Sequence, residues 1–146
     1  MKLSTRGRYG TRAMLDLALH YGNGPILVKD IADRQDVSER YLEQILVALK
    51  VAGLVRSTRG SGGGFVLARS PDKITVGEIM RAIEGSTAPV ACVDNPTVCT
   101  RQNACVMYDI WKDVKIAIDG VLDAVSLQDM VERHKDKTAL LKLSHT

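Results

Sequence analysis

Residues 38–68 read SERYLEQILVALKVAGLVRSTRGSGGGFVLA, and this stretch decides the fold. Ser38 is a favourable residue to cap a helix, and the apolar residues after it recur at helical spacing as far as Gly53. Beyond Gly53, alternating apolar and polar residues flank the glycine-rich turn 60–64. This pattern predicts two short strands joined by a loose, basic tip, so the stretch as a whole predicts a helix followed at once by a β-hairpin.

Two further helices are expected upstream. Apolar residues recur about every fourth position from Tyr9 to Tyr21, which predicts a helix over residues 5–22. A shorter amphipathic helix is expected at 29–35, joined by a tight turn to the helix after Ser38. Two helices joined by so short a turn form a helix-turn-helix, and the hairpin that follows makes the expected unit a winged helix.

The second half of the chain predicts a helix, a loop and a longer helix. Thr75 and Glu78 form a capping-box pattern, in which the two residues exchange hydrogen bonds, at the start of a helix to about Glu84. Residues 86–104 lack periodicity and contain two prolines, so a long loop is expected there. Loops of that length are usually functional or disordered. A long amphipathic helix is expected over about 105–125.

The apolar stripe of that long helix is the expected dimer contact. Because the upstream helices already have partners, the stripe is expected to pack against a second copy of the chain, with folding back on its own domain as the alternative. Ser126 is expected to cap a last short helix, followed by a frayed tail from Lys135. The expected fold is mainly α with a small β-hairpin wing, a winged helix-turn-helix plus a long dimerisation helix. Its expected parts are a DNA-binding domain (1–85), a cysteine-bearing loop (86–104), the dimerisation helix with a short C-terminal helix (105–135) and a flexible tail (136–146).

Composition and charge restrict the function. The 146 residues are 45% apolar and 25% charged, which is a globular composition. Residues 1–70 hold 11 Lys/Arg against 6 Asp/Glu, whereas residues 71–146 hold 9 against 11, so the expected winged helix is basic and suits a polyanion. Neither a membrane span nor a secretory signal is recognisable, and a cytoplasmic location is expected. The sequence shows no nucleophile–base pair, nucleotide loop or His cluster, so an enzyme is not expected.

The outward positions of the expected recognition helix are candidate base contacts. In a winged helix these side chains enter the major groove, where base edges are distinguishable. The candidates are Ser38, Arg40, Glu43 and Gln44, with Tyr41 partly available. Gln44 is able to form two hydrogen bonds with adenine, and Arg40 is able to donate to guanine or to a phosphate. Glu43 is able to accept a hydrogen bond from the cytosine amino group, and it disfavours DNA sites that offer no such donor. A solvated helix face is the alternative reading.

The tip of the wing supplies two more candidates, Arg59 and Gly60. A tip without bulky side chains lets an arginine approach the narrow, electronegative minor groove. The glycines do not form a nucleotide-binding loop, because a strand follows them where a helix is required. A flexible linker is also disfavoured, since strand patterns flank the tip on both sides.

The three cysteines, Cys92, Cys99 and Cys105, all lie in the expected loop and at its end. Their spacing does not match the paired C-x-x-C of zinc sites. Thiolates spread along a loop are instead expected to hold an iron–sulfur cluster, which needs four protein ligands and therefore one that is not cysteine. Buried structural thiols, or a redox-active disulfide with one spare thiol, are the alternatives.

Several segments together resemble the IscR-type iron–sulfur cluster regulators. These are bacterial winged-helix transcription factors in a broader family that includes nitric-oxide and cysteine-metabolism sensors. The resemblance covers roughly residues 1–130, through MKLSTRGRYGTRAMLDLA, DVSERYLEQILVALKVAGLV, RGSGGGFVLAR, ITVGEIMRAIEG and the three cysteines ahead of the helix at Trp111. It implies a homodimer joined by the long helix, a 2Fe–2S cluster and control of cluster-assembly genes. It also implies cluster ligation by Cys92, Cys99 and Cys105, base contacts by Arg40, Tyr41, Glu43 and Gln44, and a minor-groove contact by Arg59.

Two positions depart from the family pattern. The resemblance implies a histidine as fourth ligand three residues after the last cysteine, and this sequence has Tyr108 there. Asp109, Asp94 or a group from the partner subunit are alternative ligands. The nitric-oxide sensors use a carboxylate near the N-terminus of the partner subunit, and this sequence has Arg8 there, which cannot ligate.

The leading hypothesis is a homodimeric DNA-binding regulator that senses iron–sulfur cluster status and controls cluster biogenesis genes. Its expected partners are double-stranded promoter DNA, a second copy of the chain and cluster-assembly proteins. One alternative is a regulator that responds to thiol oxidation or nitric oxide without a cluster. The other is an interaction protein that binds a metabolic enzyme.

Overall fold

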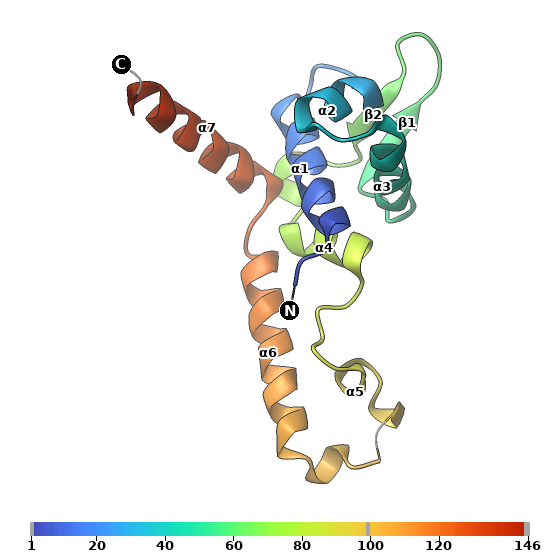
Figure 1. The fold of residues 1–146 in the computed structure, drawn as a ribbon, viewed down its shortest axis with the longest axis vertical. Helices are drawn as coiled ribbons and strands as arrows, with labels where there is room; N and C mark the ends of the chain where they lie inside the picture. The colour runs from blue at the N-terminus through green and yellow to red at the C-terminus, as the bar shows by residue number, and fades with distance from the viewer. Residues whose placement is uncertain (1, 99, 145–146) are drawn as a thin grey trace.

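Four helices, α1 to α4, and a hairpin form a head at one end of the molecule, and two long helices extend from it (Figure 1). The computed structural model describes residues 2–98 and 100–144. The elements are α1 (Thr5–Leu19), α2 (Val28–Gln35), α3 (Glu39–Val51), β1 (Val55–Thr58), β2 (Gly64–Leu67), η1 (Pro71–Lys73), α4 (Val76–Glu84), α5 (Ala91–Asp94), η2 (Pro96–Val98), η3 (Gln102–Ala104), α6 (Val106–Asp123) and α7 (Leu127–Ser144). This mainly helical fold with a two-stranded hairpin confirms the predicted winged-helix class. In the described part of the chain, no helix has the length and apolar character needed to cross a membrane.

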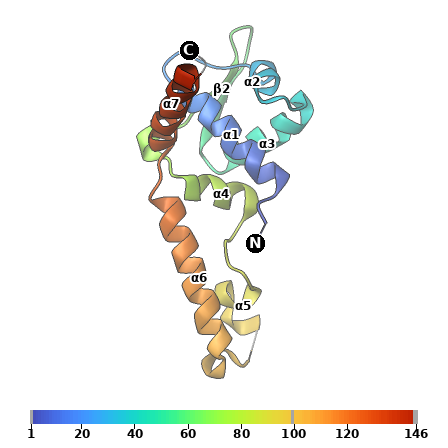
Figure 2. The same ribbon diagram turned by 60° about the vertical axis from the view of Figure 1, so that its left-hand side comes forward.

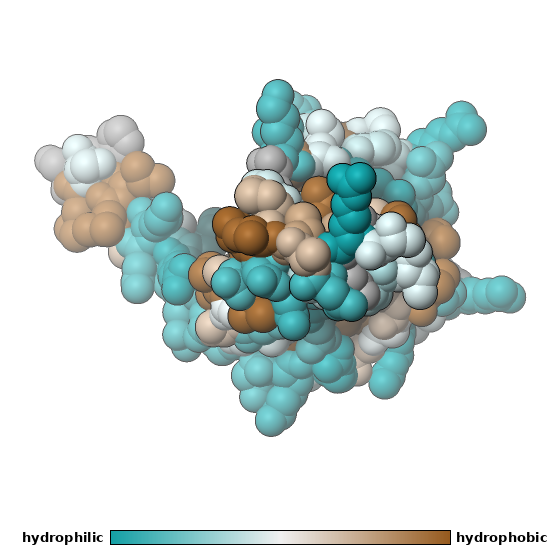
Figure 3. Space-filling view, turned by 90° about the horizontal axis from the view of Figure 1, so that it is seen from below, coloured by the Kyte–Doolittle hydropathy of each residue, from teal (hydrophilic) through white to brown (hydrophobic). Residues whose placement is uncertain are grey.

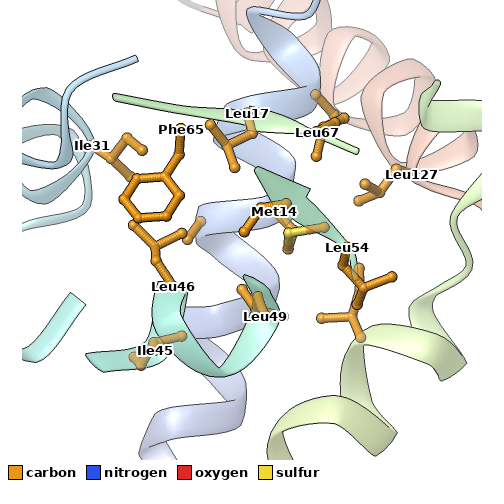
Figure 4. Packing of buried hydrophobic residues seen from close by; sticks show 14 of the residues in the cluster. Met14, Leu17, Ile31, Ile45, Leu46, Leu49, Leu54, Phe65, Leu67 and Leu127 are labelled. Atoms are coloured by element: carbon orange, nitrogen blue, oxygen red, sulfur yellow. The ribbon is translucent and has the colours of Figure 1, made fainter. Parts of the chain in front are cut away.

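The core of the head is built from apolar side chains of α1, α3 and the hairpin (Figure 4). Met14 and Leu17 enter it from α1, Leu46 and Leu49 from α3, and Phe65 from β2, and all five are buried. The buried positions of α3 follow helical spacing, so one face of α3 is in the core and the opposite face is in solvent. Core packing therefore decides which side chains α3 presents outward.

An ion pair between the partly exposed Arg34 and the buried Asp16 fixes α2 against α1. The Asp16 side chain is 3% exposed. Arg34 donates two hydrogen bonds to its carboxylate, from Nε at 2.9 Å and from Nη2 at 2.8 Å, and Gln35 Nε2 adds a third at 3.2 Å. Because a buried charge without its partner is strongly destabilising, this pair holds the first two helices in one arrangement. The turn into α3 then passes through Asp36, whose φ is 52°.

The wing is an antiparallel hairpin in which Val55 pairs with Leu67 and Thr58 with Gly64. On its other edge, Phe65 exchanges two backbone hydrogen bonds with Ile26, at 2.9 and 2.8 Å. Gly64 lies so close to this segment that a Cβ atom there would collide with the Ile26 carbonyl oxygen, and its φ is 152°. β2 is therefore anchored from both sides, and Gly64 makes the approach of Ile26 sterically allowed.

Helix α6 connects a distant end of the molecule, where α5 lies beside it, with the head (Figures 1 and 2). After α6, the chain is tied back to the head by backbone hydrogen bonds from Val76 N–H to Val125 (2.9 Å) and from Leu127 N–H to Ile74 (2.8 Å). Helix α7 then packs on α1, and its Leu127 side chain is completely buried. The position of α6 is thus determined at its C-terminal end by the head.

Two helix ends differ from the sequence-based expectation. Helix α1 ends at Leu19 rather than at residue 22, because the amides of His20 and Tyr21 turn back to the carbonyl groups of Asp16 and Ala18. Tyr21 is exposed as a result. Helix α7 is not short, since it continues to Ser144 through residues with high helix propensity such as Lys, Leu and Ala.

The capping of α4 and α7 and the conformation of residues 86–104 also differ from the sequence-based expectation. The Thr75 hydroxyl caps α4 by accepting from the Glu78 amide (3.1 Å), but the Glu78 carboxylate accepts from Arg69 and does not complete the box. A complete capping box occurs instead at α7, where Ser126 and Asp129 exchange hydrogen bonds of 2.9 and 3.0 Å. The expected loop 86–104 contains the short helices α5, η2 and η3.

We expect Gly64→Ala to destabilise the head, because the new methyl group would collide with the backbone of Ile26 and strain the chain. The expected loss is about 2 kcal/mol in the free energy of unfolding, measured by urea denaturation followed by circular dichroism. Gly62→Ala is the matched control, since a Cβ there meets no atom within 4 Å. Equal stability of the two variants would contradict the assigned contact.

Candidate nucleic-acid interface and cysteine segment

The exposed face of α3 carries the polar side chains that the sequence selected. Ser38 caps the helix by accepting from the Tyr41 amide at 3.2 Å, and it precedes the exposed Arg40, Glu43 and Gln44. These three lie opposite the buried face of α3, because residues three and four apart share one side of a helix. The structure therefore brings together a guanidinium, a carboxylate and an amide on one surface.

Tyr41 is placed differently from its neighbours. Its side chain is half-buried and meets the ring of Tyr9 edge-on, with 6.1 Å between centroids. The Arg12 guanidinium lies 5.1 Å from the centre of the Tyr9 ring, and its Nε donates to Gln35 Oε1 at 2.9 Å. Arg12 is thus a cation beside the start of α3 that the sequence reading missed. The sequence could have indicated this contact, because Tyr9 and Arg12 are three residues apart and therefore lie on one face of the helix.

The wing presents Arg59 and Gly60 at its exposed tip. A Cβ at Gly60 would meet no atom within 4 Å, whereas one at Gly63 would lie 2.5 Å from the Thr58 carbonyl oxygen. The tip glycines therefore serve two purposes, since Gly63 allows the hairpin to close and Gly60 leaves space around the tip. Lys50 at the end of α3 donates to Ser57 on β1 at 2.6 Å, which links the recognition helix to the wing.

The cysteine segment, residues 86–98 and 100–105 in the described structure, lies beside α6 and away from this surface (Figure 1). Cys92 is in α5 and Cys105 is the N-cap residue of α6, and both are partly exposed. Both lie in the described part of the chain, and no disulfide joins them. Cys99 is outside the described residues. Within the described segment, Cys105 makes no side-chain capping bond, so its sulfur is not occupied by the helix.

Thiolates are the usual protein ligands of iron–sulfur clusters, so the cysteines of this segment match such a cluster in residue type. Among the described residues, which do not include Cys99, no group of three or more His, Cys, Asp and Glu side chains is placed to hold a metal ion. Of the candidates for a fourth ligand, Tyr108 is half-buried and Asp109 exposed, both in the first turn of α6. Asp94 is exposed at the end of α5. Each of the three candidates is therefore close to a cysteine in the sequence.

A network of charges centred on Asp119 of α6 joins the cysteine segment to the head. Arg81 of α4 donates to Asp123 at 2.8 Å and lies 3.5 Å from Asp119. Asp119 also accepts from Lys115 at 2.9 Å and from the Thr87 hydroxyl at 2.6 Å. Helix α6 is therefore tied both to α4 and to the start of the segment that leads to Cys92.

The electrostatics of this network follow from its geometry. The hydrogen bond from Lys115, then that from Thr87, lowers the pKa of Asp119. The hydrogen bond to Asp119 raises the pKa of Lys115, and the charge of Asp94 at the end of α5 raises it further. The hydrogen bond to Asp123, and then the charges of Asp123, Asp119 and Glu78, raise the pKa of Arg81. Charged side chains of α4, α5 and α6 are therefore close enough to shift one another's pKa values.

A basic helix-turn-helix with a polar recognition face and a glycine-rich wing is the architecture of a winged-helix DNA-binding regulator. Residues 3–133 match the Rrf2 family, which is described as an iron-dependent transcriptional regulator. The chain belongs to this family, and it is a DNA-binding transcriptional regulator and not an enzyme.

Relatives of two kinds are similar to the chain. The HTH-type transcriptional regulator IscR of Aliivibrio salmonicida is 40% identical over 90% of this chain and 77% of its own length. The solved structure of IscR from T. potens covers 94% of this chain and 90% of its own at 43% identity, with a TM-score of 0.76. CymR of B. subtilis, titled the global cysteine regulator, covers 91% and 98% at 40% identity, with a TM-score of 0.74.

We expect Asp119→Asn to lower the free energy of unfolding by about 1 kcal/mol at pH 7, because the charge-assisted bonds are lost. The folded pKa of Asp119 is lowered, so its stabilisation is present above the unfolded pKa and is lost as the pH falls through the folded pKa. The wild type and the variant should therefore converge in urea denaturation as the pH falls below about 4, the ordinary pKa of an aspartate. Asp113→Asn, an exposed acid on the same helix, is the control. A constant difference at all pH values would contradict this role.

Proposed function

We propose that this protein is a homodimeric regulator that senses iron–sulfur cluster status and controls cluster biogenesis genes. The observation that carries the proposal is the connection of the cysteine segment to the DNA-binding head through α6 and Asp119. Similarity to IscR proteins supports it. Promoter DNA, a second copy of the chain and cluster-assembly proteins are the proposed partners, and the cytoplasm is the proposed location.

Cys92, Cys99 and Cys105 are the proposed cluster ligands, and the fourth ligand stays open between Tyr108, Asp109, Asp94 and a group from the partner subunit. Bound at these thiolates, a 2Fe–2S cluster would supply one-electron redox chemistry and a reversible link between α5 and α6. Cys92 and Cys105 belong to two different helices, so ligation by both restrains α5 against α6. Thr87 and Arg81 then transmit that restraint to the head, because both contact carboxylates of α6.

The dimer is proposed to form through α6. Its side chains Val106, Ile116 and Val121 are each more than half exposed, and Ala117, Ile118, Val121 and Leu122 line a shallow apolar groove. Figure 3, which views the molecule from below, shows brown apolar residues exposed among the teal ones at this end of the molecule. An amphipathic helix with an uncovered apolar stripe suits packing against a second copy of itself. Two heads would then be placed for half-sites about one DNA turn apart.

In each head, Ser38, Arg40, Tyr41, Glu43 and Gln44 are the proposed major-groove residues. Arg40 and Gln44 have the donors that guanine and adenine edges accept, and Glu43 selects against sites without a donor. Arg59 and Gly60 are the proposed minor-groove residues of the wing, and Arg12 is a further candidate for a phosphate contact. The contact between Tyr41 and Tyr9 restrains the start of the recognition helix.

The second candidate is a regulator that responds to thiol oxidation or nitric oxide without a cluster. Cys92 and Cys105 are partly exposed thiols, and a relative is titled a global cysteine regulator. No observation favours the interaction protein that binds a metabolic enzyme, whereas the family description favours a transcriptional regulator.

The cluster is tested on protein purified without oxygen, by an ultraviolet–visible spectrum with iron and acid-labile sulfide assayed on the same sample. We expect a red-brown protein with about two irons and two sulfides per chain. Cys92→Ser and Cys105→Ser should abolish both, and Tyr108→Phe should make the cluster more labile, with the exposed Tyr21→Phe as the matched control. Protein that stays colourless after reconstitution would favour the thiol-based candidate.

DNA recognition is tested by fluorescence anisotropy on a promoter duplex. Gln44→Ala and Arg59→Ala should each lower the affinity about tenfold, the value of one good base contact, whereas Lys137→Ala on the exposed part of α7 should not. A footprint with two half-sites is expected for the dimer. Equal affinity of cluster-loaded and cluster-free protein at every site would contradict the sensing role.

A further inference from the structure

The outward face of α3 carries an apolar residue, Val47, after its polar residues. Val47 lies three residues after Gln44 and four after Glu43, so it shares their face of the helix. It points away from Leu46 and Leu49, which are in the core, and its own side chain is 50% exposed. An isolated exposed valine is ordinary on a protein surface, but this one lies in line with the proposed base contacts.

The chemistry of the major groove limits what such a side chain recognises. Base edges present hydrogen-bond donors and acceptors, which a valine cannot use, and one apolar group, the C5-methyl of thymine. Valine is also stiff at χ1, so little side-chain freedom is lost on contact. We propose that Val47 is a specificity-determining residue that contacts a thymine methyl group in the operator.

The next exposed apolar residue on this face provides a comparison. Val51 is 84% exposed and is the last residue of α3, just before the turn at Gly53. Recognition helices contact bases mainly through their N-terminal part, so Val51, at the C-terminal end of α3, is expected to lie further from the bases than Val47. Val47 is one turn closer to Gln44, and the two valines therefore form a matched pair for substitution.

The inference rests on the proposed placement of α3 in the major groove. The experiment uses the full-length protein and a duplex selected from a random library, in which each thymine is replaced in turn by deoxyuridine. Deoxyuridine removes the methyl group and leaves the hydrogen-bonding edge unchanged. Affinities are measured by fluorescence anisotropy at one salt concentration, with circular dichroism to confirm that each variant is folded.

We expect one replacement in each half-site to weaken binding of the wild type by about three- to fivefold, the effect of one methyl group leaving water. Val47→Ala should bind the thymine duplex as weakly as the wild type binds the deoxyuridine duplex, and should not respond to the replacement. Val47→Ile and Val51→Ala should respond as the wild type does.

Two results would overturn the inference. One is a wild type that is insensitive to deoxyuridine at every position, and the other is a Val47→Ala variant that keeps the full loss of affinity. Failure of the proposed function itself has a different signature, because Arg40→Ala and Gln44→Ala would then bind the selected duplex as tightly as the wild type does. In that case α3 is not in the groove, and both proposals fall together.

Discussion

The Asp119 carboxylate is the point on which the arrangement of this molecule depends. It is held by Lys115 and Thr87 and lies beside Arg81, so three parts of the chain meet there: the long helix, the beginning of the cysteine segment and the head. Gly77 of α4 leaves room for the Asp123 carboxylate, which a Cβ atom at that position would displace. A displacement of α6 therefore cannot occur without disturbing contacts that reach the DNA-binding head.

The two candidate sites are held in different ways, and the difference suits the proposed function. The outward face of α3 is set by a closely packed core, and the buried Asp16 carboxylate with Arg34 holds α2 against α1, so the same residues of α3 always face outward. Of the described cysteines, Cys92 instead lies on the short helix α5 and Cys105 at the N-terminal end of α6, and both are partly exposed. A DNA-binding surface benefits from rigidity, whereas the proposed sensor needs a segment whose conformation changes when a ligand binds.

The helical periods in the sequence predicted most elements, but not where helices stop. The apolar spacing of α1 continues to Tyr21, yet the helix ends at Leu19 because hydrogen bonds of the last turn reverse the chain. Similarly, the polar composition after Lys135 suggested a frayed tail, but α7 continues to Ser144. Figure 3 shows apolar residues at the far end of α7, which extends away from the head. Apolar periodicity does not mark such ends, since capping hydrogen bonds and helix propensity decide where a helix stops.

The sequence by itself determined the order of the elements, the winged helix and the side chains on the outward face of α3. Periodicity and turn residues are local properties, and a face opposite a buried stripe follows from helix geometry. Only the tertiary structure decided that Tyr41 packs on Tyr9, that Arg12 stands beside the recognition helix and that Asp119 links α4 to the cysteine segment. These contacts join residues far apart in the chain, and their partners are chosen by the packing of whole helices.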